Sequence, residues 1–105
     1  MRVLYSESGK KEFDKFSFRV RKEFLKIFVA LEKGMQLSRK KFKNIVNTKL
    51  YEARVKNSSG IYRGLGGYKR SNFILVLFFK KDTQRIPRRH LETAKRRFRD
   101  IDNIL

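Results

Sequence analysis

The sequence contains no cysteine, a single histidine (His90) and only ten acidic residues. The lack of cysteine excludes a disulfide framework, a thiolate metal site and a thiol nucleophile, and it is compatible with a reducing compartment. One histidine without a cluster of carboxylates leaves too few ligands for a zinc or calcium site. We therefore expect neither a metal nor another cofactor.

Long hydrophobic stretches are also missing. The longest unbroken apolar run has seven residues, 73–79, whereas a membrane-spanning helix needs about 20. The first 13 residues lack the apolar segment of a signal peptide. These absences predict a soluble cytoplasmic protein that has no membrane partner.

Positive charge is present in large excess. The chain has 28 Lys and Arg residues against 10 Asp and Glu, a net charge of +18, and residues 54–99 hold 14 cations and two acids. Charge of this size repels itself in a folded protein, so we expect a polyanionic partner. Nucleic acid, a ribosome and an acidic protein all fit. An anionic membrane surface fits least, because no helix combines a free apolar face with a basic one.

The N-terminal half is predicted to be mainly helical. With 105 residues and 40% hydrophobic composition, residues 1–105 are expected to form one domain. A strand is expected over 2–5, followed by a short helix that Ser6 caps and then by a helix over about 17–33. Gly34 is expected to end that helix, and residues 35–48 read as a basic connector. The predicted apolar positions of the two helices are Phe13, Phe16, Val20, Phe24, Ile27, Phe28 and Leu31, with Leu25 widening the second face.

The C-terminal half predicts three strands and a helix. The strands are expected over 50–56, 61–65 and 73–80, joined by turns at 57–60 and 64–72. The unbroken apolarity of the third strand predicts a central position with both faces covered. Pro87 is expected at the first position of a final helix, whose apolar stripe is Leu91, Ala94, Phe98, Ile101 and Leu105. The predicted fold is therefore α+β: an N-terminal strand, a helical hairpin, a three-stranded antiparallel meander and a C-terminal helix.

Cations of the meander form a candidate phosphate site. We expect four of them to converge on one patch: Arg54, Arg63, Lys80 and Lys81. Arginine suits this role because its planar guanidinium is permanently charged and matches a phosphate. The alternative is a solvated sheet face on which Glu52 forms ion pairs and two lysines mark the exit of a strand into water.

Other basic residues are candidates for contacts with nucleic acid, with plain solvation as the alternative: Lys56, Lys69, Arg70, Arg88, Arg89 and Arg96. His90 lies in a basic run and is expected to be exposed surface rather than a catalytic group. The Gly64–Gly67 stretch joins two strands and no Lys-Ser/Thr follows it, so it does not match a nucleotide-binding loop. Its glycines are expected to allow tight turning and local mobility.

Two blocks, KLYEARVKNSSGIYR (49–63) and FILVLFFKKDTQRIPRRHLETAKRRF (73–98), resemble the RelE/ParE toxin superfamily. The resemblance is closest to its phage-derived, HigB-like branch. The residues that carry it are Leu50, Tyr51, Glu52, Ala53, Arg54, Tyr62, Arg63, Phe79, Lys80, Lys81, Gln84, Pro87, Ala94 and Arg97. The order of elements agrees over nearly the whole chain, and the specific motif covers about half of it.

The resemblance implies a RelE-like microbial RNase fold and a type II toxin that cleaves mRNA on the ribosome without a metal. Its partners would be the ribosome, mRNA and a cognate antitoxin with a DNA-binding domain. The family's basic positions match Arg54, Arg63, Lys80 and Lys81, which would bind and polarise the phosphate. Glu52 and Tyr62 would orient groups or move protons, whereas His90 falls where an acidic residue is common and inherits no role. The alternative is a non-catalytic member of the superfamily that binds nucleic acid or inhibits gyrase.

Overall fold

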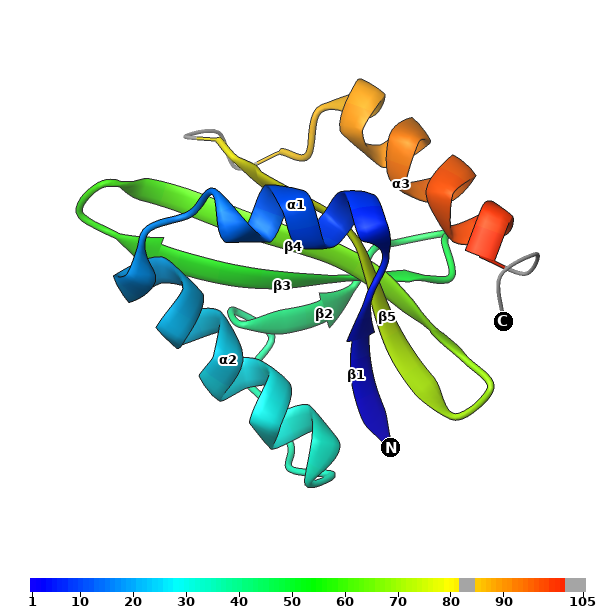
Figure 1. Cartoon of the computed structure of the whole chain (residues 1–105), viewed down its shortest axis with the longest axis horizontal. Helices are drawn as coiled ribbons and strands as arrows, with labels where there is room; N and C mark the ends of the chain where they lie inside the picture. The colour runs from blue at the N-terminus through cyan, green and yellow to red at the C-terminus, as the bar shows by residue number, and fades with distance from the viewer. Residues whose placement is uncertain (82–84, 102–105) are drawn as a thin grey trace.

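The computed structural model describes residues 1–81 and 85–101. In chain order the elements are β1 (Arg2–Tyr5), α1 (Glu7–Asp14), α2 (Phe18–Glu32), β2 (Phe42–Asn44), β3 (Leu50–Asn57), β4 (Gly60–Lys69), β5 (Asn72–Lys80) and α3 (Arg88–Asp100). The strands form one sheet in the order β1-β5-β4-β3-β2 (Figure 1). β1 pairs with β5 in parallel and the other neighbours are antiparallel. This arrangement confirms the predicted α+β class. Among the described residues, no helix has the length and apolarity to cross a membrane.

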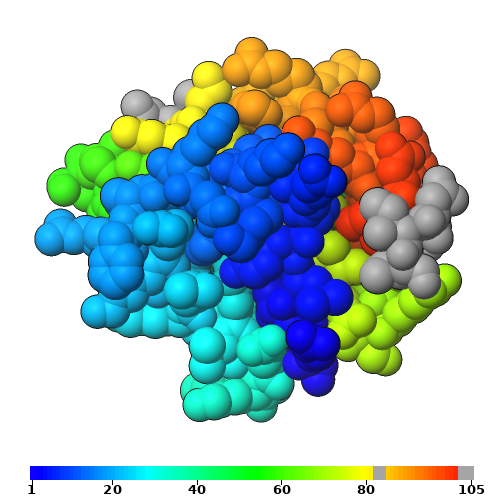
Figure 2. Space-filling model, in the orientation of Figure 1, coloured from blue at the N-terminus to red at the C-terminus, as the bar shows by residue number. Residues whose placement is uncertain are grey.

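Helices cover both faces of the sheet. Phe13 of α1 and Phe24 of α2 belong to one hydrophobic cluster, together with Phe73 and other residues of the sheet. Ala94 and Ile101, at the other end of the chain, pack on the opposite face in a second cluster. Figure 1 shows α2 doubling back at an incline from the end of α1, and in Figure 2 these two helices cover much of the visible face. β5 lies between β1 and β4 with side chains in both clusters, so its predicted central position is confirmed.

The ends of α1 and α2 follow from local sequence signals. The hydroxyl of Ser6 accepts a hydrogen bond from the backbone N–H of Gly9 at 3.0 Å, and Ser17 caps α2 in the same way. Gly34 has φ +70° and its N–H donates to the carbonyl of Leu31, which ends α2 as predicted. Leu25 does not widen the buried face, because it is 47% exposed.

Two further boundaries differ from the prediction. The basic connector contains the short strand β2, whose residues Phe42–Asn44 pair with residues 51–53 of β3. Only Phe42 of these three is half-buried, so the segment lacks the alternation that would have identified a strand. Pro87 is the N-terminal cap of α3 rather than its first helical residue. Leu105 and Gln84 lie outside the described residues.

The glycine-rich segment is strand and not turn. β4 continues through Gly64, Gly66 and Gly67 to Lys69, and only residues 70–71 form the turn to β5. Since these three glycines do not have positive φ values, the expectation that they allow tight turning is wrong.

The glycines of β4 instead make room for aromatic rings. A Cβ atom at Gly64 would lie 2.6 Å from the ring of Phe78, and one at Gly67 would lie 2.7 Å from the ring of Phe98. Phe78 belongs to the cluster under α1 and α2, whereas Phe98 belongs to α3. The glycines therefore let both helical layers pack closely on β4.

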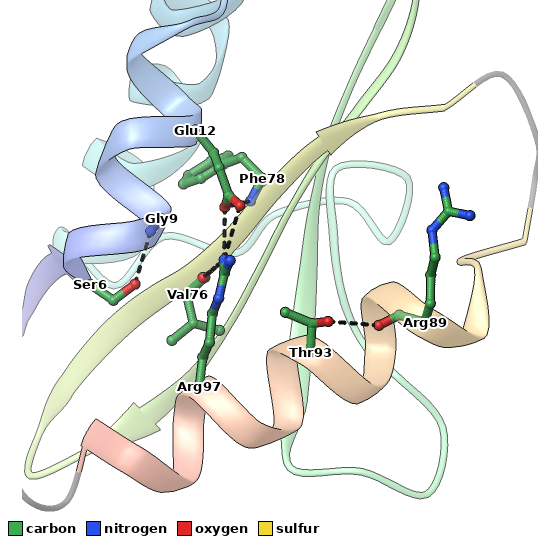
Figure 3. Close-up of polar contacts among 8 residues, drawn as sticks. All are labelled: Ser6, Gly9, Glu12, Val76, Phe78, Arg89, Thr93 and Arg97. Atoms are coloured by element: carbon green, nitrogen blue, oxygen red, sulfur yellow. Dashed lines mark hydrogen bonds and ion pairs between the residues drawn. The ribbon is translucent and has the colours of Figure 1, made fainter.

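Side chains replace a strand along part of β5. The pairing of β1 with β5 reaches only to Leu75. Beyond it, the Glu12 carboxylate accepts a hydrogen bond from the backbone N–H of Phe78 at 3.1 Å and two from Arg97 at 3.0 Å (Figure 3). Arg97 also donates to the carbonyl of Val76 at 2.9 Å. One ion pair thus satisfies two backbone groups of β5, the N–H of Phe78 and the carbonyl of Val76, and ties α1 and α3 to the strand.

Candidate phosphate-binding site

Two of the predicted phosphate ligands, Arg54 and Arg63, are direct partners in the register of β3 and β4. Arg63 is fully buried, at 0% exposure, and its guanidinium lies 3.2 Å from the carboxylate of Glu52, which is 3% exposed. Burial lowers the pKa of Arg63, Glu52 opposes that effect, and the nearby charge of Arg54 adds to it. Arg63 is therefore held beneath the surface, and a phosphate would compete with Glu52 for it.

The burial of Arg63 follows from its place on the α3 face of the sheet. Arg63 and Leu65 are two positions apart in β4, so their side chains lie on the same face of the sheet. Leu65 belongs to the cluster under α3. Across the ladder, Arg63 pairs with Phe79 of β5, which belongs to the same cluster. The candidate site therefore lies between the sheet and the layer that contains α3.

His90 lies over this part of the sheet. Its ring stacks on Phe79, with 4.2 Å between the ring centroids and 18° between the planes. Burial lowers the pKa of His90, as do the neighbouring charges of Arg89 and Lys81, while Glu12 opposes them. These effects favour the neutral imidazole, the form that can accept a proton.

The expected convergence of four cations needs correction at Lys80. Because side chains alternate along a strand, Lys80 and Lys81 leave β5 on opposite faces. Lys80 pairs with Tyr62 in the ladder, and its ammonium lies 5.5 Å from the centre of the Tyr62 ring. Tyr62 belongs to the cluster under α1 and α2, and its hydroxyl bonds to Ser59 at 2.7 Å. Lys80 and Tyr62 thus lie across the sheet from Arg63.

The structure therefore brings together a smaller set of residues on the α3 face: Glu52, Arg54, Arg63, Lys81 and His90. His90 is part of this set although the sequence predicts it to be exposed surface. One sequence signal could have identified His90. Phe79 is an apolar residue at the end of β5, and an aromatic residue there can contact the first turn of the final helix, which carries His90.

The other predicted contacts with nucleic acid are spread over the molecule. Lys56 is exposed at the end of β3. The ammonium of Lys69 lies 4.4 Å from the centre of the Phe98 ring and donates to the Phe98 carbonyl, so it helps to hold α3. Arg70 is exposed in the turn between β4 and β5. The remaining three are exposed on α3: Arg88, Arg89 and Arg96. Within residues 1–81 and 85–101, no group of three His, Cys, Asp or Glu side chains could hold a metal ion.

The fold is that of the RelE toxins. A chain of the RelB–RelE antitoxin–toxin complex from Methanococcus jannaschii matches with a TM-score of 0.58 and 19% identity, over 74% of this chain and 89% of that one. The isolated E. coli RelE toxin matches with a TM-score of 0.56 and 18% identity, over 90% of this chain and 96% of that one. A chain of the intact E. coli RelBE toxin–antitoxin complex matches with a TM-score of 0.56 and 19% identity, over 78% of this chain and 98% of that one.

The family is shown by sequence. The model of the phage-derived protein Gp49-like family matches residues 11–99, so the chain belongs to that family. No curated protein sequence matches the chain. Together, the family and the fold confirm the expected resemblance to the RelE/ParE toxin superfamily.

Proposed function

We propose that this protein is the toxin of a type II toxin–antitoxin pair and that it cleaves mRNA on the ribosome. The observation that carries the proposal is the grouping of Arg54, Arg63, Lys81 and His90 on one face of a RelE-like sheet. Cations stabilise the charge that develops on a phosphate under attack, and a neutral imidazole accepts a proton. The same face thus has groups for both requirements of RNA cleavage.

In the proposed reaction, the 2′-hydroxyl of one nucleotide attacks the adjacent phosphorus. A bond forms between O2′ and phosphorus, the bond from phosphorus to O5′ breaks, and the products are a 2′,3′-cyclic phosphate and a free 5′-hydroxyl. His90 takes the proton from the 2′-hydroxyl, and a water molecule donates a proton to O5′ as it leaves. Arg54 and Lys81 bind the phosphate oxygens, and Arg63 joins them when it exchanges Glu52 for phosphate.

The proposed partners are the ribosome, mRNA and a cognate antitoxin, and the proposed location is the cytoplasm. Two of the structures with this fold are toxin–antitoxin complexes, which supports an antitoxin as partner. The net charge of +18 suits a protein that binds to ribosomal RNA. On the ribosome the substrate is already positioned, so a site with few catalytic groups can still react rapidly.

The test is induced expression of the protein followed by mapping of the 5′ ends of cellular mRNA. We expect new 5′-hydroxyl ends within coding regions. Lys81→Ala and His90→Ala should each reduce cleavage by about 100-fold, the usual effect of losing a group that stabilises the transition state or one that takes the proton from the nucleophile. Lys33→Ala, which removes an exposed cation at the end of α2, is the matched control. An absence of new ends with the wild-type protein would reject the enzymatic function.

The burial of Arg63 favours a second candidate, a non-catalytic member that binds nucleic acid or inhibits gyrase. As long as Glu52 occupies Arg63, that guanidinium does not reach a phosphate. A gyrase supercoiling assay with the purified protein separates the candidates. Inhibition of supercoiling without new mRNA ends would identify the second candidate, and new ends without inhibition would identify the first.

A further inference from the structure

A second basic site lies on the other side of the sheet, at the edge formed by β3. β2 pairs with β3 only as far as Ala53, so the end of β3 extends beyond its neighbour. The segment before β2 remains close through one hydrogen bond, from the N–H of Arg54 to the carbonyl of Lys41 at 2.9 Å. A cavity of about 540 Å³ opens between α2, residues 37–41 and this end of β3.

The walls of the cavity are strongly cationic. Among the described residues, six cations line it: Arg19, Lys26, Lys40, Lys41, Arg54 and Lys56. The one carboxylate among its lining residues is Glu23, which already lies 3.2 Å from the ammonium of Lys26. The single lining carboxylate therefore offsets only a small part of the positive charge of the six lining cations. Such a concentration of like charge raises the free energy of the isolated protein and is relieved by an anion.

The shape and chemistry of the cavity favour a polymer backbone. Its apolar lining residues are aliphatic, namely Ile27, Leu37 and Val55, and none of its described lining residues is aromatic. Bases are usually held by stacking on aromatic rings, so this site would not select bases. Lysines spread over α2, a loop and a strand match several phosphates along a chain better than one small anion.

We propose that the cavity between α2 and the end of β3 binds the phosphodiester backbone of RNA, independently of base sequence. It would act as a second RNA contact, outside the α3 face on which cleavage is proposed. The inference relies on the proposed function only for the choice of RNA as the polyanion. The RNA is either a single strand, as in mRNA, or a duplex, as in much of ribosomal RNA, because both present the same phosphates.

The test measures affinity of the full chain for fluorescent 2′-O-methyl RNA, as a 12-nucleotide single strand and as a 12-base-pair duplex, at several salt concentrations. This RNA has no free 2′-hydroxyl and cannot be cleaved by the proposed route. The measurement is therefore independent of whether the protein is a nuclease, and failure of one proposal can be told from failure of the other.

The key variant carries Lys40→Gln, Lys41→Gln and Lys56→Gln, which remove three exposed cations that line the cavity. The slope of log affinity against log salt should decrease by about 2 on the single strand, and affinity at 0.1 M salt should fall by about 100-fold, since each lost phosphate contact contributes about 0.7 to the slope. A matched control of equal charge replaces three exposed cations that do not line the cavity: Lys15, Lys33 and Lys49.

Each possible outcome either supports or overturns the proposal that the cavity binds RNA. Loss of binding in the cavity variant with near-normal binding in the control supports the proposal, and the strand or duplex that shows the loss identifies the kind of RNA. Equal losses in the two variants would mean that binding depends on total charge, which overturns it. Undetectable binding by the wild-type protein also overturns it. So does a cavity-dependent affinity for polyglutamate that matches or exceeds that for RNA, because the partner would then be an acidic protein.

Discussion

Removal of either partner of the buried ion pair between Glu52 and Arg63 is expected to destabilise the protein strongly. The pair lies 3.2 Å apart, and the two side chains are 4% and 0% exposed. Glu52→Leu removes the carboxylate that lies against this buried guanidinium, which should lower the free energy of unfolding by about 3–5 kcal/mol. That is a large fraction of the roughly 5–15 kcal/mol typical of a domain. Arg63→Met, which leaves the Glu52 carboxylate buried, should have a similar effect at pH 7.

The double variant Glu52→Leu/Arg63→Met should recover most of this loss. Replacing a buried ion pair by apolar groups is often neutral or stabilising, so the coupling energy between the two sites should be at least about 3 kcal/mol. Urea unfolding followed by circular dichroism measures it. The exposed pair of Lys10 and Asp14, 2.7 Å apart, is the control. Its coupling energy should stay below about 1 kcal/mol.

The same variants separate the structural role of Arg63 from its proposed chemical role. Loss of toxicity in Arg63→Met alone is ambiguous, because the variant is expected to unfold more easily. A double variant that is stable but no longer cleaves mRNA would support phosphate binding by Arg63, and one that is stable and fully toxic would remove Arg63 from the site. A coupling energy no larger than that of the exposed pair would refute the reasoning from burial.

Two further predictions concern α3. Because burial and the charges of Arg89 and Lys81 lower the pKa of His90 in the folded protein, the unfolded chain takes up this proton more readily. The contribution of His90 to stability is therefore complete above pH 6.5 and is lost as the pH falls from there through the pKa of the folded state. Urea unfolding at a series of pH values should show that His90→Gln removes this part of the pH dependence. Gly67→Val should destabilise by about 1–3 kcal/mol through overlap with the Phe98 ring, and a variant with unchanged thermal unfolding would contradict the close packing of α3 on β4.

The helices and the central strand could be predicted because their signals are local. Ser6 and Ser17 precede helices whose apolar residues repeat on one face, and Gly34 supplies the positive φ that ends α2. The run 73–79 has no polar position, so both of its faces had to be covered. In each case the determining residues lie within a few positions of one another.

The glycines of β4 and the short strand β2 could not be predicted because their determinants are distant in sequence. Gly67 is accommodated in a strand because the ring of Phe98, 31 positions later, occupies the space of a side chain. β2 is a strand because residues 51–53 present a free edge beside it. Composition alone makes both segments look like loops.

The sequence predicts which strands carry the candidate site, but it does not predict on which face of the sheet each side chain lies. Two adjacent strands predict the partnership of Arg54 with Arg63, whereas the predicted convergence of Lys80 with Lys81 fails because side chains alternate along a strand. Burial of Arg63 depends on α3, and the role proposed for His90 depends on the stacking of that helix residue on Phe79. These relations exist only after the helix has packed on the sheet.

Arg54 connects the two proposed RNA surfaces, and this limits what its substitution can establish. It lies beside Arg63 on the α3 face and also lines the cavity near α2, because β2 ends opposite Ala53 and leaves Arg54 at the open edge of the sheet. An RNA strand that passes around this edge would contact Arg54 whichever surface holds it more tightly. Loss of function in Arg54→Ala would therefore not distinguish cleavage from binding. Lys81→Ala tests the α3 face alone, since Lys81 lines no part of the cavity, and the triple variant of the cavity tests the other surface.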